Sequence, residues 1–401
     1  MRRVAVTGLG AISAAGMTAD ETWVAVRDGR SAIGPIDCKR GERLTVPVAA
    51  QARAFDPAAH FSPRKMSMLD RFAQLAIVAA REAFADSGLD REDRAVRLAP
   101  VILGIGVGGI DTLDDAFHTV YGQGQAKVHP MTIPRLMCNA APSLVSMDLG
   151  LMGMTYALAS ACASGTHAIG TAFHMVRGGA AQVALTGGTE ACITFGTMLA
   201  WEALRVLSYE NCRPFSRNRS GLVIGEGAGM LVLEEWGHAV ERGAHIYAEV
   251  VGFGGNADAG EITSMDKENA AEAMRLAMRD AGLLPAAFGY VNAHGTGTAM
   301  NDKLESAAIH LAFEGAPKPL VSSSKAVLGH CLGAAGALEA LVAAKALEEQ
   351  IVPPTANCTD PETELGLDFV PEGPRATNFD ACLSNSFAFG GLNAVLALRR
   401  V

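Results

Sequence analysis

Hydrophobic and polar positions along this chain follow two spacings that replace each other in turn. Short, almost continuous apolar runs that end in glycine or another small residue are typical of buried strands. Such runs lie at residues 3–8, 100–109, 155–158, 182–190, 246–255, 288–292, 320–324, 383–385 and 394–399. Apolar residues at helical spacing predict helices over residues 19–28, 68–85, 168–176, 269–281, 303–313 and 334–349. We interpret residues 221–234 as two antiparallel strands and residues 143–153 as a loop.

The order of strands and helices begins again near His245. Strands that alternate with helices in both parts of a chain predict related α/β/α units packed together. We therefore divide the chain into residues 1–245 and 246–401. Neither a flexible linker nor a low-complexity tract separates them, so we expect the two parts to share one core.

Composition and charge exclude several classes of protein. Hydrophobic residues make up 49% of the chain and the mean hydropathy is +0.20, which favours surface buried in an oligomer. The net charge of −9 argues against nucleic-acid binding. Gly8 and Gly10 follow the first strand without a third glycine at the fingerprint spacing, which is weak evidence for a dinucleotide site. No run of about 18 uncharged apolar residues is present, so we expect no membrane span.

The eight cysteines are scattered without CxxC pairs, so neither a zinc site nor a disulfide framework is predicted, and no metal is expected. Arg2 and Arg3 lead directly into the first strand without the apolar segment of a signal peptide. Both observations favour a reducing cytoplasm.

Cys162 lies among small residues, where the strand at 155–158 gives way to a helical pattern. Unpaired backbone N–H groups at the start of a helix favour a thiolate, which is the nucleophilic form of cysteine. The alternative is an ordinary buried cysteine, and Cys162 alone does not decide between the two.

Three further segments repeat this arrangement of a strand, small residues and then a polar side chain. Because strand ends of an open α/β sheet converge on one crevice, residues remote in sequence can meet there. The segments are Asn292-Ala293-His294-Gly295-Thr296-Gly297-Thr298, Ser322-Ser323-Ser324-Lys325-Ala326-Val327-Leu328-Gly329-His330 and Ser384-Asn385-Ser386-Phe387-Ala388-Phe389-Gly390-Gly391.

With these motifs the chain resembles the elongating β-ketoacyl-acyl carrier protein synthases, which are condensing enzymes of the thiolase-like superfamily. The resemblance extends from the first strand to Val401, and residues 200–203 and 212–216 are similar to the nodulation-type members. It implies a five-layered αβαβα core of two thiolase-like halves and a homodimer. It also implies decarboxylative Claisen condensation of an enzyme-bound acyl group with malonyl-acyl carrier protein, giving 3-oxoacyl-acyl carrier protein and CO2. Substrates would be carried on the phosphopantetheine of the carrier protein, with no other cofactor.

The resemblance assigns roles to the polar residues. Cys162 would hold the acyl group as a thioester, while neutral His294 and His330 would donate N–H bonds to the malonyl thioester oxygen. The backbone N–H groups of Cys162 and Phe389 would form the oxyanion hole. Lys325 and Glu305 would form an ion pair that orients the histidines.

The same resemblance indicates how substrates are held. Thr296 and Thr298 match pantetheine-binding threonines. Phe389, followed by Gly390 and Gly391, would gate access of the malonyl group, because glycines tolerate the backbone changes of a hinge. Val107 matches the position that gates the acyl pocket near the dimer interface, and Trp201 would lie close to it.

The basic cluster Arg64, Lys65 and Arg71 precedes or begins the second predicted helix. A short charge cluster usually marks a solvated helix start. Since carrier proteins are acidic, we expect these three residues to help dock one.

Other members of the superfamily fit less well. A thiolase needs a further catalytic cysteine near the C-terminus, and Cys382 lacks the expected Cys-Xaa-Gly context. Initiating synthases use one histidine and one asparagine, and chain-length factors lack the cysteine. The sequence leaves open whether a heterodimeric partner is needed, which acyl chain is preferred, and whether the pathway makes fatty acids, polyketides or a specialised lipid.

Overall fold

The computed structural model describes all 401 residues and contains one mixed ten-stranded sheet. The strands lie in the order β10-β9-β13-β14-β8-β1-β7-β6-β4-β5. Their bounds are β1 Val4–Ser13, β4 Val101–Gly104, β5 Thr155–Leu158, β6 Val183–Glu190, β7 Gly227–Glu235, β8 Ala248–Ala257, β9 Phe288–Asn292, β10 Leu320–Ser322, β13 Ala381–Ala388 and β14 Leu392–Arg399. The short strands β2 Gly34–Pro35, β3 Val48–Ala49, β11 Ile351–Val352 and β12 Arg375–Ala376 form two separate ribbons.

The sheet consists of two five-stranded halves with the same connectivity. In the first half β4 is parallel to β5 and β6, while β7 is antiparallel to β6 and β1. In the second half β9 is parallel to β10 and β13, while β14 is antiparallel to β13 and β8. The halves meet where Val4, Ala5 and Val6 of β1 pair with β8. The repeat predicted from the sequence is present, whereas the division between residues 245 and 246 stays a prediction.

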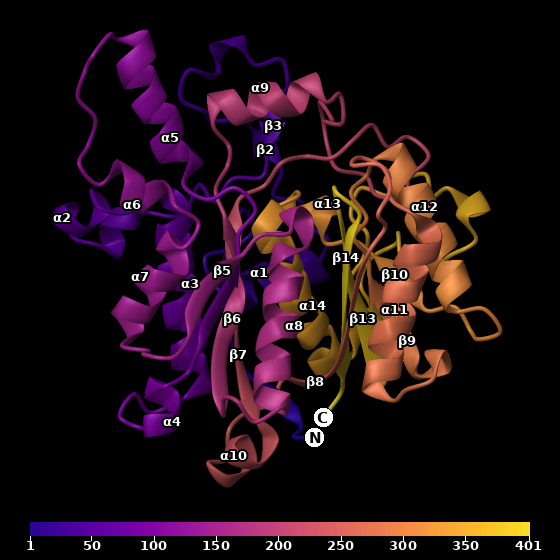
Figure 1. Ribbon diagram of the computed structural model, residues 1–401. Helices are drawn as coiled ribbons and strands as arrows, with labels where there is room; N and C mark the ends of the chain where they lie inside the picture. Colours follow the sequence, from indigo (N-terminus) through magenta and orange to yellow (C-terminus); the bar gives the residue numbers. More distant parts are fainter.

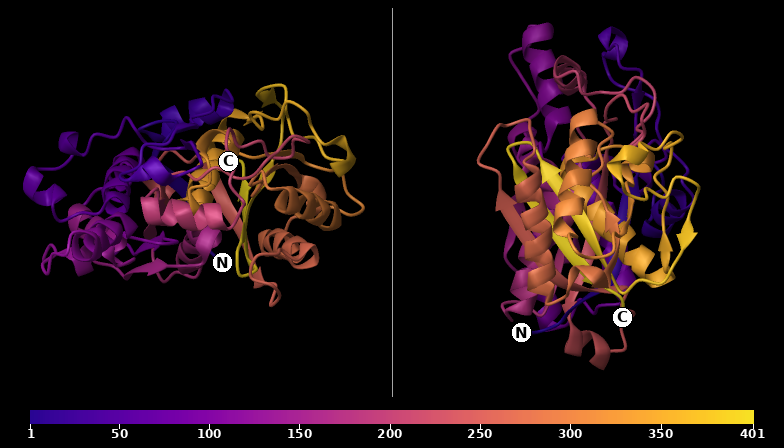
Figure 2. Two further views of the ribbon diagram at one scale, coloured as in Figure 1. Left: turned by 90° about the horizontal axis from the view of Figure 1, so that it is seen from above. Right: turned by 90° about the vertical axis from the view of Figure 1, so that its right-hand side faces the viewer.

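Helices cover both outer faces of the sheet and fill the space between its halves (Figure 1). The helices are α1 Ala19–Arg27, α2 Pro63–Met66, α3 Arg71–Ser87, α4 Arg94–Arg97, α5 Ile110–Phe117, α6 Thr132–Leu136, α7 Ala140–Leu149, α8 Ser164–Arg177, α9 Phe195–Ala203, α10 Trp236–Glu241, α11 Lys267–Ala281, α12 Ala299–Ala312, α13 Lys325–Leu328 and α14 Ala335–Glu349. Five layers follow one another across the molecule. Helices α3 and α7 cover the outer face of the first half of the sheet, helices α8 and α14 lie between the two halves, and helices α11 and α12 cover the outer face of the second half. In the right-hand view of Figure 2, α11 and α12, in orange, lie in front of the yellow strands of the second half.

The central helices form the core that both halves share. Every residue of α14 from 335 to 347 is buried, which is typical of a helix packed on all sides. Its many alanines let the neighbouring strands approach closely, and Leu338 and Leu341 fill the remaining space. Truncation of such a fully buried leucine to alanine costs about 2–5 kcal/mol.

Each central helix begins after the same kind of turn. The 3-10 turn Ala161–Ala163 precedes α8, and the 3-10 turn Leu332–Ala334 precedes α14. The first residue of each turn has a positive φ, +49° at Ala161 and +44° at Leu332. Non-glycine residues rarely adopt this conformation, so both turns hold a strained backbone that the surrounding core must enforce.

Two predicted elements are wrong. The segment 143–153 is helical up to Leu149, because the apolar residues Ala141, Val145 and Leu149 share one face against α3. Residues 221–226 form only isolated bridges, so the predicted strand pair is the single strand β7. None of the helices combines the length and the apolar character needed to cross a membrane.

Candidate active site

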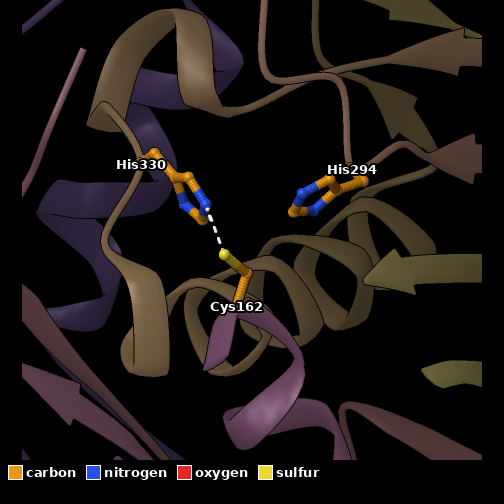
Figure 3. Close-up of side chains that lie close together, drawn as sticks. All are labelled: Cys162, His294 and His330. Carbon is orange, nitrogen blue, oxygen red and sulfur yellow. Dashed lines mark hydrogen bonds between the residues drawn. The ribbon is translucent and has the colours of Figure 1, made fainter. Parts of the chain in front are cut away.

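Cys162 lies in the turn before α8, a helix that contacts strands of both halves of the sheet. It is 6% exposed, and His330 lies within hydrogen-bond distance, with Nε2 2.9 Å from Sγ (Figure 3). His294 follows β9 and faces the same thiol from the opposite side. The two imidazole rings are nearly perpendicular, with centroids 5.4 Å apart. The structure therefore brings together the cysteine of the first half and the two histidines of the second.

Hydrogen bonds on the far side of each ring fix the histidine tautomers. The backbone N–H of Leu332 donates to Nδ1 of His330 at 3.3 Å, and Nζ of Lys325 donates to Nδ1 of His294 at 3.4 Å. Because each Nδ1 accepts a hydrogen bond, each neutral ring carries its proton on Nε2. Both Nε2–H groups consequently act as donors toward the space around the Cys162 sulfur.

Burial controls the protonation of all three side chains. It lowers the pKa of His294 and of His330 well below the ordinary value, and the charge of Lys325 acts in the same direction. Burial also raises the pKa of Cys162 to about 12, although Lys325 and the backbone N–H groups of Cys162 and Phe389 lower it. The resting site thus holds two neutral imidazoles and a thiol. The thiolate expected from the helix start is outweighed by burial.

Lys325 pairs with Glu339 rather than with Glu305, so the predicted ion pair is wrong. The Lys325 ammonium contacts Glu339 in α14, and these side chains are 1% and 2% exposed. The sequence offered one clue to this residue, namely a lone carboxylate within the apolar stretch of α14 before Lys345.

Glu305 has a different task in the structure. Its Oε1 accepts from the backbone N–H of His294 at 2.8 Å, and its Oε2 accepts from that of Gly295 at 2.7 Å. Burial raises the pKa of Glu305 to about 7, while these hydrogen bonds lower it. Asp302, one turn earlier in α12, accepts from the backbone N–H of Gly297 at 3.1 Å. The two carboxylates of α12 therefore hold the loop that presents His294, and sequence analysis missed the second.

A cavity of about 460 Å³ leads to the sulfur. It is lined by residues that sequence analysis predicted, Cys162, Trp201, His294, Thr296, Thr298, His330 and Phe389, and by residues that it missed, including Thr263, Met265, Met300 and Leu304. The Thr296 and Thr298 hydroxyls are 3.0 Å apart at this wall. The missed residues come from loops and an exposed helix face, where no periodicity marks them.

The segment after Phe389 has the backbone of a hinge. Phe389 is 36% exposed, and its ring lies 6.2 Å from that of Trp201. Gly390 and Gly391 have φ of +86° and +67°, a region that favours glycine. Phe389 thus lies between the cavity and a segment that only glycines form without strain.

The remaining predicted residues do not line this cavity. Val107 is 40% exposed on the loop after β4. Lys65 pairs with Asp148 at 2.6 Å, and Arg71 forms two hydrogen bonds with Glu226. Arg64 is exposed, and its side chain forms no ion pair within the chain. Of the three basic residues expected to dock a carrier protein, Arg64 is the one whose charge is not balanced internally.

Cys162, His294 and His330 are also the set of potential metal ligands whose donor atoms all lie within 4.8 Å of one another. A metal would have to bind the two Nε2 atoms, since each Nδ1 accepts a hydrogen bond. In these tautomers Nε2 carries the proton. The arrangement therefore suits hydrogen-bond donation to a substrate oxygen better than metal ligation.

Comparison with known proteins agrees with this geometry. A doubled α/β fold with a cysteine on one half and two histidines on the other defines a thiolase-like condensing enzyme. The family models "Beta-ketoacyl synthase, N-terminal domain" and "Beta-ketoacyl synthase, C-terminal domain" match residues 1–239 and 247–359. The chain belongs to the β-ketoacyl synthase family.

Relatives and solved structures match along the whole chain. Nodulation protein E of Rhizobium sp. (strain N33) is 42% identical over 401 residues, with all of both chains covered. The 3-oxoacyl-[acyl-carrier-protein] synthase 2 of Staphylococcus aureus (strain N315) is 40% identical, covering 100% of this chain and 98% of the relative. A ketosynthase in complex with a type II polyketide-synthase acyl carrier protein has a TM-score of 0.91 at 30% identity and full coverage of both chains.

Proposed function

We propose that Cys162 accepts an acyl group from an acyl carrier protein and that this acyl group is then condensed with malonyl-acyl carrier protein to give 3-oxoacyl-acyl carrier protein and CO2. The observation that carries the proposal is the Nε2–Sγ distance of 2.9 Å between His330 and Cys162, with Nδ1 of both histidines already occupied. Such a site presents one nucleophile and two fixed N–H donors at the wall of a cavity that a substrate can enter.

In the first half-reaction, the Cys162 sulfur attacks the acyl thioester carbonyl and the pantetheine thiol leaves with the proton that the cysteine loses. The carbonyl oxygen gains negative charge as the bond forms. The backbone N–H groups of Cys162 and Phe389, which also lower the pKa of the thiol, would donate hydrogen bonds to this oxygen. A neutral thiol suits a resting enzyme because it does not react with other electrophiles before the carrier protein arrives.

In the second half-reaction, the malonyl carboxylate leaves as CO2 and its electron pair forms an enolate on the thioester. The developing charge on the thioester oxygen accepts hydrogen bonds from Nε2–H of His294 and of His330. The second donor becomes available because an acylated sulfur no longer binds it. The enolate carbon then attacks the acyl carbonyl, and the released Cys162 thiolate takes up a proton from solvent. No metal or redox group is required by these steps, since the substrates arrive on phosphopantetheine.

The site supports a route for the pantetheine arm. The Thr296 and Thr298 hydroxyls lie on the cavity wall, where they can bond the arm's amides. Phe389 would move aside to admit the malonyl group, and Trp201 would border the acyl chain. Val107 would reach the acyl pocket from the loop after β4.

The carrier protein would dock through Arg64, with Lys65 and Arg71 in support. Arg64→Glu is expected to raise the apparent KM for carrier-bound substrate several-fold and to leave a short pantetheine substrate unaffected. Arg94→Glu, at a second exposed arginine of the same half, is the matched control. Equal effects on both substrates, or equal effects of both variants, would remove the docking assignment.

We also propose a homodimer. β5 is one of the two edge strands of the ten-stranded sheet, and an open edge needs a cover. Met147, Met152 and Met154 beside it are 76%, 59% and 63% exposed. Sedimentation of the native protein and of the double variant Met152→Lys/Met154→Lys tests this surface. A native monomer, or a variant as dimeric as the native protein, would refute it.

All eight cysteines are free, which supports a reducing, cytoplasmic location for this thiol enzyme.

Intact-mass analysis tests the covalent step. The native protein and Cys162→Ala are mixed with acyl-acyl carrier proteins of graded chain length. An acyl adduct on the native protein alone is the expected result, and release of 3-oxoacyl product after malonyl-acyl carrier protein is added completes the reaction. Absence of any adduct would instead favour a subunit that works only beside a heterodimeric partner.

A further inference from the structure

A buried carboxylate that the proposed mechanism does not use lies behind the catalytic turn. Glu190 is the last residue of β6 and is fully buried. Its hydrogen bonds all come from backbone N–H groups. They are donated by Gly106 at 2.7 Å, by Val107 at 3.1 and 3.2 Å, by Gly108 at 3.1 Å and by Gly333 at 3.2 Å. A carboxylate is costly to bury, and here charge-assisted hydrogen bonds rather than a cation stabilise it.

The position of Glu190 follows from the sheet. β6 is parallel to β4, with Gly188 beside Gly104, so Glu190 lies just beyond the end of β4. There the chain turns through residues 105–108. Glycine is needed on both sides of the carboxylate, because a Cβ on Gly106 would lie 2.6 Å from Oε2 of Glu190 and a Cβ on Gly333 would lie 2.3 Å from the Gly106 nitrogen. The contact of Glu190 with Gly106 and Gly333 therefore leaves no room for a side chain at either glycine.

Two parts of the proposed active site meet at this carboxylate. Gly333 follows His330 by three residues, and Leu332 between them supplies the N–H that fixes the His330 tautomer. On the other side is the loop 106–108 with Val107. A Cβ on Gly106 would also lie 3.7 Å from the carbonyl oxygen of Ala161, the residue before Cys162. One side chain thus sets the spacing between the His330 segment and the loop beneath Cys162.

We propose that Glu190 is a positioning residue of the condensation. Its carboxylate holds the loop 106–108 against the segment 330–334, which fixes the direction of the His330 Nε2–H and the room left for an acyl chain on Cys162. The proposal rests on the proposed function and deepens it. Glutamine cannot replace this group, because its NH2 would face N–H donors that need an acceptor.

The test compares Glu190→Gln with Glu82→Gln. Glu82 also accepts two backbone N–H bonds, from Ala11 and Ala19, and burial raises the pKa of each of these two carboxyl groups to about 7. Glu82 lies on α3, away from the cavity. Each variant is assayed for loading by octanoyl- and palmitoyl-acyl carrier protein, for kcat and KM in condensation per loaded site, and for thermal unfolding.

For Glu190→Gln we expect kcat per loaded site to fall about 10- to 100-fold with KM for malonyl-acyl carrier protein within about twofold, because a misplaced donor affects the transition state. The ratio of palmitoyl to octanoyl loading should rise at least about threefold, since Val107 gains freedom to move. Glu82→Gln should change neither quantity. Glu190→Asp keeps both oxygens but shortens the side chain, and it should shift the loading ratio in the same direction.

Three results would overturn the proposal. In the first, Glu190→Gln loses stability but keeps the native kcat per loaded site and the native loading ratio. In the second, Glu82→Gln shifts the ratio equally. In the third, neither Glu190 variant folds, which would assign the residue to stability alone. Failure of the proposed function would look different, because the native protein itself would then form no acyl adduct.

Discussion

The ion pair between Lys325 and Glu339 leads to the sharpest stability prediction. Glu339→Gln keeps the size of the side chain and one hydrogen-bond acceptor but removes the negative charge. Lys325 would then remain buried with neutral His294 as its other hydrogen-bond partner. Glu305→Gln is the matched control. It makes the same isosteric change at a second buried carboxylate and leaves Lys325 and its counter-ion Glu339 in place.

The size of the effect follows from burial. The two side chains are 1% and 2% exposed, so water cannot replace the lost charge. Removing one partner of a buried pair costs about 3–5 kcal/mol, whereas a solvent-exposed pair is worth less than about 1 kcal/mol. Glu305→Gln retains an oxygen for one of two backbone N–H groups, so we expect a loss of about 1–3 kcal/mol. Lys325→Met/Glu339→Gln removes both charges and should recover much of the loss.

Urea denaturation at one fixed protein concentration measures these differences, because the apparent stability of an oligomer depends on concentration. Acyl loading of Cys162 is followed on the same samples. A loss below about 1 kcal/mol for Glu339→Gln would show that the pair is solvated and would refute the reasoning. So would a double variant that is less stable than Glu339→Gln alone.

Three further predictions concern the site itself. His294→Ala removes one N–H donor and should slow condensation about 10²- to 10³-fold while acyl loading persists, whereas His330→Ala also removes the hydrogen-bond partner of the Cys162 sulfur and should slow both steps. Intact-mass analysis measures loading, and release of the 3-oxoacyl product measures condensation. Burial keeps the pKa of both histidines well below 6.5, so their contribution to the free energy of unfolding should decrease as pH falls through 6.5, where the unfolded chain takes up protons at these positions and the folded chain does not; the difference between the native protein and His294→Ala in urea denaturation at several pH values separates this contribution from that of the carboxyl groups with a pKa of about 7. Gly390→Ala forces a side chain into φ +86° and should cost about 1–2 kcal/mol and reduce use of malonyl-acyl carrier protein more than acyl loading; equal effects on both steps would argue against a gate.

Local patterns in the sequence predicted most of the fold. Apolar runs placed most strands of both halves within a few residues, and β9 has the predicted bounds of 288–292, although β1 continues to Ser13, beyond the predicted 3–8, and β4 ends at Gly104, well before residue 109. Helical spacing placed α1, α11 and α14 equally well. α7 was missed, although Pro142 lies in its first turn, where proline is tolerated, and Gly150 follows its end, where glycine is favoured.

The candidate site also contains residues that local patterns predicted and contacts that they did not. Cys162, His294 and His330 come after strands, and the topology that brings strand ends together could be inferred from their order. The counter-ion of Lys325 could not, because Glu305 and Glu339 are both acidic residues on helices near the lysine in sequence. What separates them is the direction of each side chain in three dimensions. For the same reason, the engagement of Lys65 and Arg71 with Asp148 and Glu226 could not be foreseen.

The paired turns before α8 and α14 show how a duplicated architecture becomes asymmetric. Cys162 and Gly333 occupy equivalent places, each one residue after a strained residue and two residues before a central helix. A thiol at 333 is sterically excluded, since its Cβ would lie 2.3 Å from the Gly106 nitrogen. Transplanting the nucleophile to the second copy would therefore fail without rebuilding the loop after β4. In the proposed mechanism one copy of the turn carries the nucleophile and the other supports the scaffold, so each chain would hold a single acyl group on an enzyme thiol at a time.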